Sequence, residues 1–247
     1  MKTLQKYIDI NCDLGEGIGN ESELMPFISS CNIACGGHAG DEETIKNVIA
    51  LAKENNVNIG AHPSFPDREN FGREEIKIGE KELKNNLQDQ ISLVQNECEK
   101  QGLKMHHIKP HGALYNLCNV DEKYAKIVLD ILVKYYPNSL LYAPYKSVIS
   151  ELAKNKISVH FEGFADRNYE DDHTLVSRKK ETALLKKKEE VLDHVLSMIL
   201  HDEIRTVSGE IIRTKSDTIC VHGDTPSAVE MIKFLYEKLP QHGVQIK

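Results

Sequence analysis

The chain has 247 residues, of which 40% are hydrophobic and 28% are charged, a balance typical of a globular protein rather than a disordered or fibrous one. This length suffices for one substantial core, and we expect a single domain over residues 1–247. Asp and Glu number 38 against 31 Lys and Arg, so the net charge is −7, which argues against nucleic acid as a partner.

Short apolar segments rich in Ile, Val and Leu recur along the chain, and each is followed by a polar motif and then by a segment with helical spacing. The expected strands are residues 7–12, 31–35, 57–61, 105–109, 140–143, 158–163 and 218–221. The expected helices are residues 41–55, 81–101, 122–136, 147–155, 181–201 and 227–239. Because strands that alternate with helices pair in parallel, we predict an α/β fold. The predicted form is a seven-stranded (β/α) barrel with helices outside and a packed apolar core inside, and an open doubly wound sheet is the alternative.

Two segments interrupt this alternation. Residues 63–79 contain two prolines and two glycines, and residues 165–180 are rich in Asp and Arg. Long charged loops inside a compact domain are more often functional than idle. We therefore expect both loops to cover a site.

The sequence also indicates where the protein works. It has no apolar run of the roughly 20 residues that a transmembrane helix needs, and its first residues lack the pattern of a signal peptide. The six cysteines contain no C-x-x-C pair, which argues against a disulfide framework or a cysteine-rich zinc site. We expect a cytoplasmic protein without a membrane partner.

Nearly every expected strand ends in a cluster of groups that can bind protons, metal ions or phosphate. These clusters are residues 11–17, 35–41, 60–64, 109–116, 162–167 and 222–226. The carboxyl ends of the strands of a parallel barrel converge on one face, where barrel enzymes have their active sites. The sequence therefore predicts one pocket built from six segments.

Four histidines, His38, His62, His111 and His222, follow expected strands beside small residues. One such histidine alone is more often structural or exposed than a ligand, but four at strand ends favour proton transfer or polarisation of a substrate. Together with Asp13 or Asp41 they could hold a divalent ion. Their spacing has no local metal signature, so the sequence leaves the metal unknown.

Two acids, Asp13 and Glu16, lie three residues apart after the first expected strand. Neighbouring carboxylates can divide the roles of general base and electrostatic stabiliser. The alternative is a turn carboxylate beside a solvated acid. Asp41 is a binding candidate that could instead cap the helix that follows it.

Cationic candidates are Lys109, at a strand end, and Arg167 and Arg178, at the two ends of the second loop. Lys109 could hold a phosphate or an oxyanion, and the arginines could clamp a carboxylate or phosphate unless they are only solvated. The remaining candidates for binding substrate or ATP are Asn116, Asp166 and Asp224. No standard phosphate-binding glycine motif is present, so an ATP site would be unconventional.

These motifs resemble those of the LamB/YcsF family: DLGEG at 13–17, NIACGGHAGD at 32–41, GAHPSFPD at 60–67, FGR at 71–73, KPHGALYN at 109–116, EGFADRNY at 162–169 and CVHGDTP at 220–226. The resemblance implies a seven-stranded barrel of the glycoside hydrolase/deacetylase type. It also implies a three-component bacterial 5-oxoprolinase with further subunits B and C. That enzyme opens 5-oxo-L-proline to L-glutamate with hydrolysis of ATP, for which Mg²⁺ is the expected cofactor.

The chain departs from the family pattern at two places. Gly37 stands where the family usually has Phe, and residues 171–178 read DDHTLVSR where the family usually reads D-G-x-L-V-P-R. These changes should alter the backbone preferences of the second loop.

Our working hypothesis is ATP-dependent hydrolysis of 5-oxo-L-proline in a multi-subunit complex. A metal-dependent carbohydrate deacetylase or amidase, with a tightly bound transition metal, is the first alternative, and a non-catalytic subunit that only binds substrate is the second.

Overall fold

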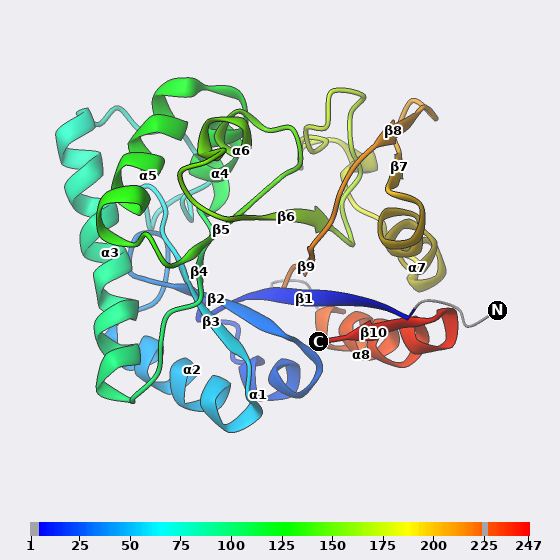
Figure 1. Cartoon of the computed structure of the whole chain (residues 1–247), viewed down its shortest axis with the longest axis horizontal. Coiled ribbons are helices and arrows are strands. Elements are labelled where there is room, and N and C mark those ends of the chain that lie inside the picture. The colour runs from blue at the N-terminus through cyan, green and yellow to red at the C-terminus, as the bar shows by residue number, and fades with distance from the viewer. Residues whose placement is uncertain (1–4, 224–226) are drawn as a thin grey trace.

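The computed structural model describes residues 5–223 and 227–247 and shows a closed barrel of parallel strands surrounded by helices (Figure 1). The barrel strands are β1 (Lys6–Leu14), β2 (Ser30–Ala34), β3 (Asn58–His62), β4 (His107–Ile108), β5 (Leu140–Ala143), β6 (Val159–Phe164) and β9 (Thr218–Val221). Neighbours in this order are paired, and β9 also pairs with β1, which closes the ring. The seven predicted strands and the (β/α) barrel are confirmed, and the open-sheet alternative is wrong.

The six predicted helices are present and lie outside the barrel (Figure 1). They are α2 (Glu42–Asn55), α3 (Glu80–Lys100), α5 (Glu122–Tyr135), α6 (Val148–Ala153), α7 (Lys188–Leu196) and α8 (Ala228–Lys238). The segment predicted as one helix over 181–201 is a 3₁₀ turn (Glu181–Ala183), then α7, then a π-helical turn (Ser197–His201). Sequence analysis missed α1 (Glu21–Leu24) and α4 (Gly112–Val120), and short 3₁₀ turns cover Met25–Phe27 and Leu239–His242.

Three short strands were also not predicted. The strands β7 (Glu203–Arg205) and β8 (Ile211–Arg213) form an antiparallel hairpin, and β10 (Val244–Ile246) pairs with the first residues of β1. Within residues 5–223 and 227–247, no helix combines the length and apolarity required to cross a bilayer.

Helix α2 shows how the sequence specifies the outer layer. The side chain of Asp41 accepts a hydrogen bond from the backbone N–H of Thr44 and so caps the first turn. The predicted apolar face, Ile45, Val48, Ile49 and Ala52, is buried. Apolar faces of this kind pack against the strands, so the apolar core lies between helices and sheet.

The inside of the barrel differs from our prediction of an apolar core. Asp9, on β1, accepts hydrogen bonds from Ser30 at 2.5 Å, Tyr142 at 3.1 Å and Thr218 at 3.3 Å. The amide of Asn11 donates to Thr218 at 2.7 Å. Because side chains alternate across a strand, the apolar positions of β1 face the helices while its polar positions face the interior. Paired polar groups therefore fill this barrel, and they lead up to its carboxyl-terminal mouth.

Candidate functional site

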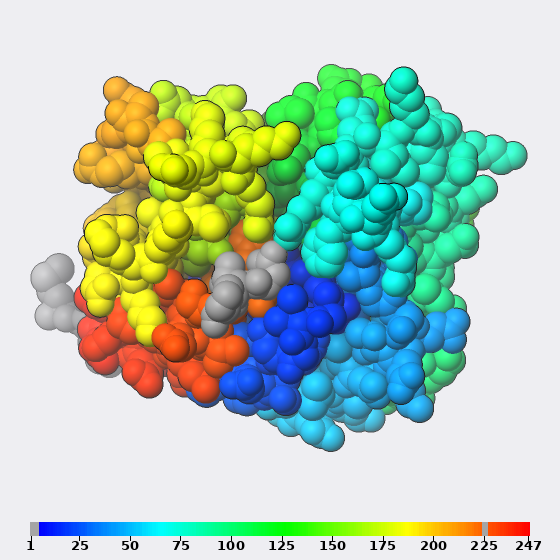
Figure 2. Space-filling view, turned by 180° about the vertical axis from the view of Figure 1, so that it is seen from behind, coloured from blue at the N-terminus to red at the C-terminus, as the bar shows by residue number. Residues whose placement is uncertain are grey.

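The loops at the carboxyl ends of the strands meet on one face of the molecule. Figure 2 shows this face, where the segments after β1 (dark blue), β3 (cyan) and β6 (yellow) come together. Near the entrance of the barrel, Glu16 follows β1, His38 follows β2, His62 ends β3, and His111 precedes α4. The predicted convergence of these strand ends is confirmed.

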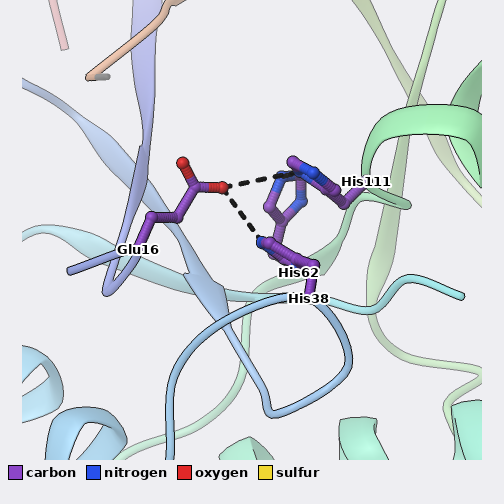
Figure 3. A group of neighbouring side chains, drawn as sticks. All are labelled: Glu16, His38, His62 and His111. Atoms are coloured by element: carbon purple, nitrogen blue, oxygen red, sulfur yellow. Dashed lines mark hydrogen bonds and ion pairs between the residues drawn. The ribbon is translucent and has the colours of Figure 1, made fainter. Parts of the chain in front are cut away.

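We call Glu16, His38, His62 and His111 the histidine cluster (Figure 3). Glu16 Oε1 lies 3.0 Å from His38 Nε2 and 3.5 Å from His111 Nδ1. His62 Nε2 lies 3.0 Å from His111 Nδ1. One ligand atom from each residue lies within 4.8 Å of those of the other three. Four potential metal ligands therefore surround one point.

Each histidine of the cluster is held through its other ring nitrogen. His62 Nδ1 lies 2.7 Å from the carbonyl oxygen of Lys109, and His111 Nε2 lies 3.0 Å from that of Phe71. His38 Nδ1 lies 3.0 Å from Ser64 Oγ. These contacts fix the orientation of all three rings.

The first long loop covers the histidine cluster, as predicted. The Phe71 ring contacts the His38 ring edge-on, with centroids 5.2 Å apart. The carbonyl oxygen of Gly72 accepts a hydrogen bond from the N–H of Ala113 in α4. Burial under this loop lowers the pKa of His38 and lowers that of His111 well below its usual value. Both imidazoles are therefore neutral at neutral pH.

A second group lies beside the first, and we call Asp13, Lys109, Tyr115 and Glu162 the ion-pair cluster. Lys109 Nζ lies 2.9 Å from Asp13 Oδ1 and 2.9 Å from Glu162 Oε1. The hydroxyl of Tyr115 donates to Glu162 Oε2 at 2.8 Å. Pro110 favours an extended backbone at Lys109, which places this side chain at the strand end. All four side chains are buried.

Electrostatics fixes the charges of this cluster. Burial alone would lower the pKa of Lys109, but Asp13 and Glu162 raise it well above its usual value. Burial would raise the pKa of Asp13, but His62 and Lys109 hold it well below its usual range. Since Lys109 already has two carboxylate partners, the geometry does not favour its predicted role as a binder of phosphate or an oxyanion.

His222 does not join the histidine cluster. Its Nδ1 lies 2.8 Å from Asp166 Oδ1, and its ring stacks on Phe164 with centroids 5.4 Å apart. Burial would raise the pKa of Asp166, but His222 lowers it. The two predicted residues thus form a separate acid–histidine pair on the β6–β9 side of the mouth.

The two predicted arginines lie in different environments. Arg167 is buried and donates to the carbonyl oxygens of Val176 at 2.7 Å and Ala183 at 3.4 Å, so it ties the second loop together. Burial and then Arg178 lower the pKa of Arg167, while Arg178 itself is exposed. Arg178 is therefore the better placed of the two to meet a ligand from solvent.

Three of the predicted binding residues, Asp41, Asn116 and Asp224, remain to be placed. Asp41 is exposed and caps α2, which is the alternative role considered for it. Asn116 is exposed on α4. Asp224 lies outside the described residues. Binding roles for these three residues stay predictions.

Sequence reasoning did not select Glu162, Tyr115, Asn32 or Ser64 as site residues. Asn32 donates to Asp13 Oδ1 at 2.7 Å and is buried inside the barrel. A signal was present, because buried polar residues alternate with apolar ones in the barrel strands. In a strand covered by helices on its outer face, such polar positions must face the interior.

Gly37, one of the departures from the family pattern, has a structural explanation. A Cβ atom at this position would overlap Ser64 Oγ and the side chain of Gln90. Gln90 is buried, accepts from the Ser64 N–H at 3.0 Å and donates to the Ser64 carbonyl at 2.8 Å. In this chain Gln90 therefore occupies the space beside residue 37 and positions Ser64, the partner of His38.

The chain resembles known proteins along almost its whole length. The model of the LamB/YcsF family matches residues 8–247. The 5-oxoprolinase A subunit of Pyrococcus abyssi is 39% identical over 245 residues, which are 97% of this chain and 96% of that protein.

Solved structures give the same picture of the fold. A lactam utilization protein from Thermus thermophilus is 32% identical, with a TM-score of 0.91 over 98% of this chain and 99% of that one. A peptidoglycan deacetylase from Bacillus subtilis, 12% identical with a TM-score of 0.51 over 98% of this chain and 87% of that one, shares the fold alone. The predicted deacetylase-type barrel is confirmed.

Proposed function

The chain belongs to the LamB/YcsF family, and from that premise we propose that it is the A subunit of a multi-subunit 5-oxoprolinase. In this proposal the complex opens 5-oxo-L-proline to L-glutamate, ATP with Mg²⁺ is the co-substrate, and subunits B and C are the partners. The relative from Pyrococcus abyssi carries the name of such a component, and the neighbour from Thermus thermophilus is named for lactam utilization. Both names support a substrate with a cyclic amide.

The observation that carries the proposal is the contact between the two clusters at the mouth of the barrel. His62 Nε2 lies 3.4 Å from Asp13 Oδ2, so the histidine cluster directly adjoins a carboxylate of the ion-pair cluster. Opening of a lactam requires removal of a proton from the attacking water and delivery of one to the departing nitrogen. Neutral imidazoles can do both, and phosphorylation by ATP would supply a better leaving group to a resonance-stabilised amide.

The pKa shifts distribute the roles. A general base works best when its pKa is close to the operating pH, so the lowered pKa of Asp13 makes this carboxylate a weak base. We therefore assign Asp13 an electrostatic role, in which it orients His62 and Lys109. The lowered pKa values of His38 and His111 make these two imidazoles weak bases by the same criterion, so we assign activation of water to Glu16 or His62. Arg178 is our candidate for the substrate carboxylate.

The proposal is tested by measuring glutamate release from 5-oxo-L-proline and MgATP. The assay compares this chain alone, subunits B and C without it, and all three together. We expect glutamate only from the full mixture, and His62→Gln should reduce it strongly, while Lys84→Met, at a half-exposed surface ion pair, should not. Equal glutamate release with and without this chain would contradict the proposal.

One observation favours a second candidate, a metal-dependent amidase or deacetylase. The histidine cluster gathers three nitrogen ligands and one oxygen ligand, which suits catalytic zinc chemistry. This candidate predicts hydrolysis of an N-acetylated sugar by the chain alone, without ATP. Ring opening that requires all three subunits and ATP would exclude it.

A further inference from the structure

We propose that the histidine cluster binds a divalent transition metal ion of the Zn²⁺ type. The ligands are Glu16 Oε1, His38 Nε2, His62 Nε2 and His111 Nδ1. Figure 3 shows the carboxylate and the three rings directed toward a common point.

The first argument is the spacing of the ligand atoms. Zinc bonds to His nitrogen and carboxylate oxygen are about 2.0–2.2 Å long, so the ligand atoms of a tetrahedral site lie about 3.3 Å apart. Glu16 Oε1 lies 3.0 and 3.5 Å from its two histidine nitrogens, and the His62 and His111 nitrogens are 3.0 Å apart. The remaining separations among the four ligand atoms extend to as much as 4.8 Å, so the cluster must contract around the ion to reach the distances that zinc requires.

The second argument is the direction of the lone pairs. The carbonyl oxygens of Lys109 and Phe71 can only accept, so His62 Nδ1 and His111 Nε2 carry the protons. The Ser64 hydroxyl donates to the Phe65 carbonyl at 2.9 Å and therefore accepts from His38 Nδ1. The opposite nitrogens of His62 and His111 then present lone pairs to each other, and His38 Nε2 faces Glu16 Oε1 at 3.0 Å, where a metal ion would replace the shared proton. Outer partners of this kind orient the histidine ligands of metal sites.

The third argument is that this arrangement is unfavourable without a cation. When both rings are neutral, with their protons on the outer nitrogens, His62 Nε2 and His111 Nδ1 face each other at 3.0 Å with no hydrogen atom to share. Asp13, Glu16 and Glu162 provide three acidic groups nearby, and Lys109 provides one ammonium. Unpaired buried acceptors are costly, and a metal ion would engage those of the histidine cluster together.

Binding requires one adjustment. The rings of His38 and His111 stack with centroids 3.6 Å apart and planes 2° from parallel. A metal lies in the plane of each imidazole that binds it, so two parallel rings cannot both meet one ion ideally. We therefore expect one of the two rings to tilt, and a structure with metal should show an angle much larger than the present one.

The role of the ion, unlike its binding, rests on the proposed function. The substrate 5-oxo-L-proline is an anion, whereas the carboxylates outnumber the ammonium at this mouth. A divalent ion would offset that negative charge and would polarise the lactam carbonyl or lower the pKa of a bound water.

The experiment measures metal binding by the untagged full-length chain after treatment with a chelator and dialysis. Calorimetric titration with Zn²⁺ should show one equivalent, and Co²⁺ should give the visible absorption of a site with nitrogen and oxygen ligands. His62→Gln and His111→Gln should each lower Zn²⁺ affinity by at least about 100-fold, because loss of an outer partner alone costs about 10–100-fold. Ser64→Ala should fall in that smaller range.

The matched control is His222→Gln, which removes a histidine from the same mouth but outside the cluster. Its Zn²⁺ affinity should stay unchanged. The proposal is overturned if the wild-type chain binds no stoichiometric metal, or if His222→Gln loses as much affinity as His62→Gln.

Binding and function fail separately in these measurements. Glutamate release by a complex whose histidine cluster holds no metal would rule out a catalytic role for the metal and leave the proposed function intact. Stoichiometric metal in a chain that supports no glutamate release would support metal binding and contradict the proposed function.

Discussion

The ion-pair cluster and the histidine cluster are neighbours at one barrel mouth, but only the first contains a lysine ammonium. Lys109 has carboxylates on two sides, and Glu162 receives the Tyr115 hydroxyl as well. In the histidine cluster, the outer nitrogens contact backbone oxygens or Ser64, whereas the inner nitrogens of His62 and His111 face each other and that of His38 faces Glu16. A buried group of polar atoms that is satisfied by its own protein contributes to a fixed structure. The histidine cluster has no ammonium of its own, and the metal ion that we propose would supply the missing positive charge.

The largest expected effect tests the first half of this comparison. Lys109→Met leaves Asp13 and Glu162 buried without their ammonium, and removal of one partner from a buried ion pair costs about 3–5 kcal/mol. Lys84→Met is the control, because Lys84 pairs with Glu80 and Asp130 at the surface, where such pairs contribute less than about 1 kcal/mol. Urea unfolding of both variants measures the difference. Similar losses in the two variants would show that the ion-pair cluster is no more than a surface contact.

The ion-pair cluster also shows how much of the site can be predicted from the sequence. Position alone placed Lys109 and Asp13 at the barrel mouth, because parallel strands present their carboxyl ends on one face. The partner Glu162 was not found, since a pairing between β4 and β6 depends on which side chains face inward and on their height in the barrel. The alternation of polar and apolar residues in β1 predicts which side chains face inward. Their height in the barrel depends on the strand register, which only the closed structure shows.

The same limit explains the histidine cluster. His38, His62 and His111 were all selected from their places after strands, but His222 was selected by the same reasoning and pairs with Asp166 instead. Strand-end position predicts which face a residue occupies. It does not predict the distances around the rim, which separate the β6–β9 side from the β1–β4 side. The hairpin of β7 and β8 was missed because its strands have only three residues each.

The pH dependence of the unfolding free energy also tests the comparison, because buried histidines that stay neutral reduce the stability of the folded chain as the pH falls. Burial lowers the pKa of His194, on α7, to about 4. Between pH of about 6.5 and about 4 the unfolded chain binds a proton at this residue that the folded chain does not, so stability falls as pH falls. The total loss from His194 approaches about 3 kcal/mol near pH 4.

The measurement is unfolding free energy against pH for the wild-type chain and His194→Gln. The variant should lose part of the slope between pH of about 6.5 and about 4 and behave like the wild-type chain above it. His38 and His111 have lowered pKa values for the same reason, so a residual slope should remain. Unchanged slope in His194→Gln would show that His194 does not contribute and that other histidines with lowered pKa values, such as His38, His107 and His111, cause the acid sensitivity.

A pair of glycine variants separates site geometry from stability. Gly72 and Gly102 both have positive φ, at 62° and 72°, so alanine at either position should cost about 1–2 kcal/mol. A Cβ atom on Gly72 would lie 3.0 Å from His38 Cβ and 3.2 Å from His111 Cδ2, whereas one on Gly102 has no described neighbour within 4 Å. Gly72→Ala should therefore impair Zn²⁺ binding and glutamate release, and Gly102→Ala should impair neither. Equal impairment would mean that lost stability, not displaced histidines, is the cause.

The smallest expected effect concerns the second loop, on the far side of the mouth from the histidine cluster. Aligned with the family pattern D-G-x-L-V-P-R, residues 172–178 place His173 where glycine usually stands, and His173 has φ of 71°. Left-handed backbone costs a side chain about 1–2 kcal/mol, and glycine avoids this cost but loses more entropy on folding. His173→Gly should therefore gain up to about 1 kcal/mol, measured by urea unfolding. Asn56→Gly, at φ of 57° at the end of α2, should gain less, because asparagine tolerates this conformation. A gain at His173 with unchanged Zn²⁺ affinity would show that the second loop can be relaxed without disturbing the histidine cluster, whereas a loss of affinity would mean that the two sides of the mouth are coupled.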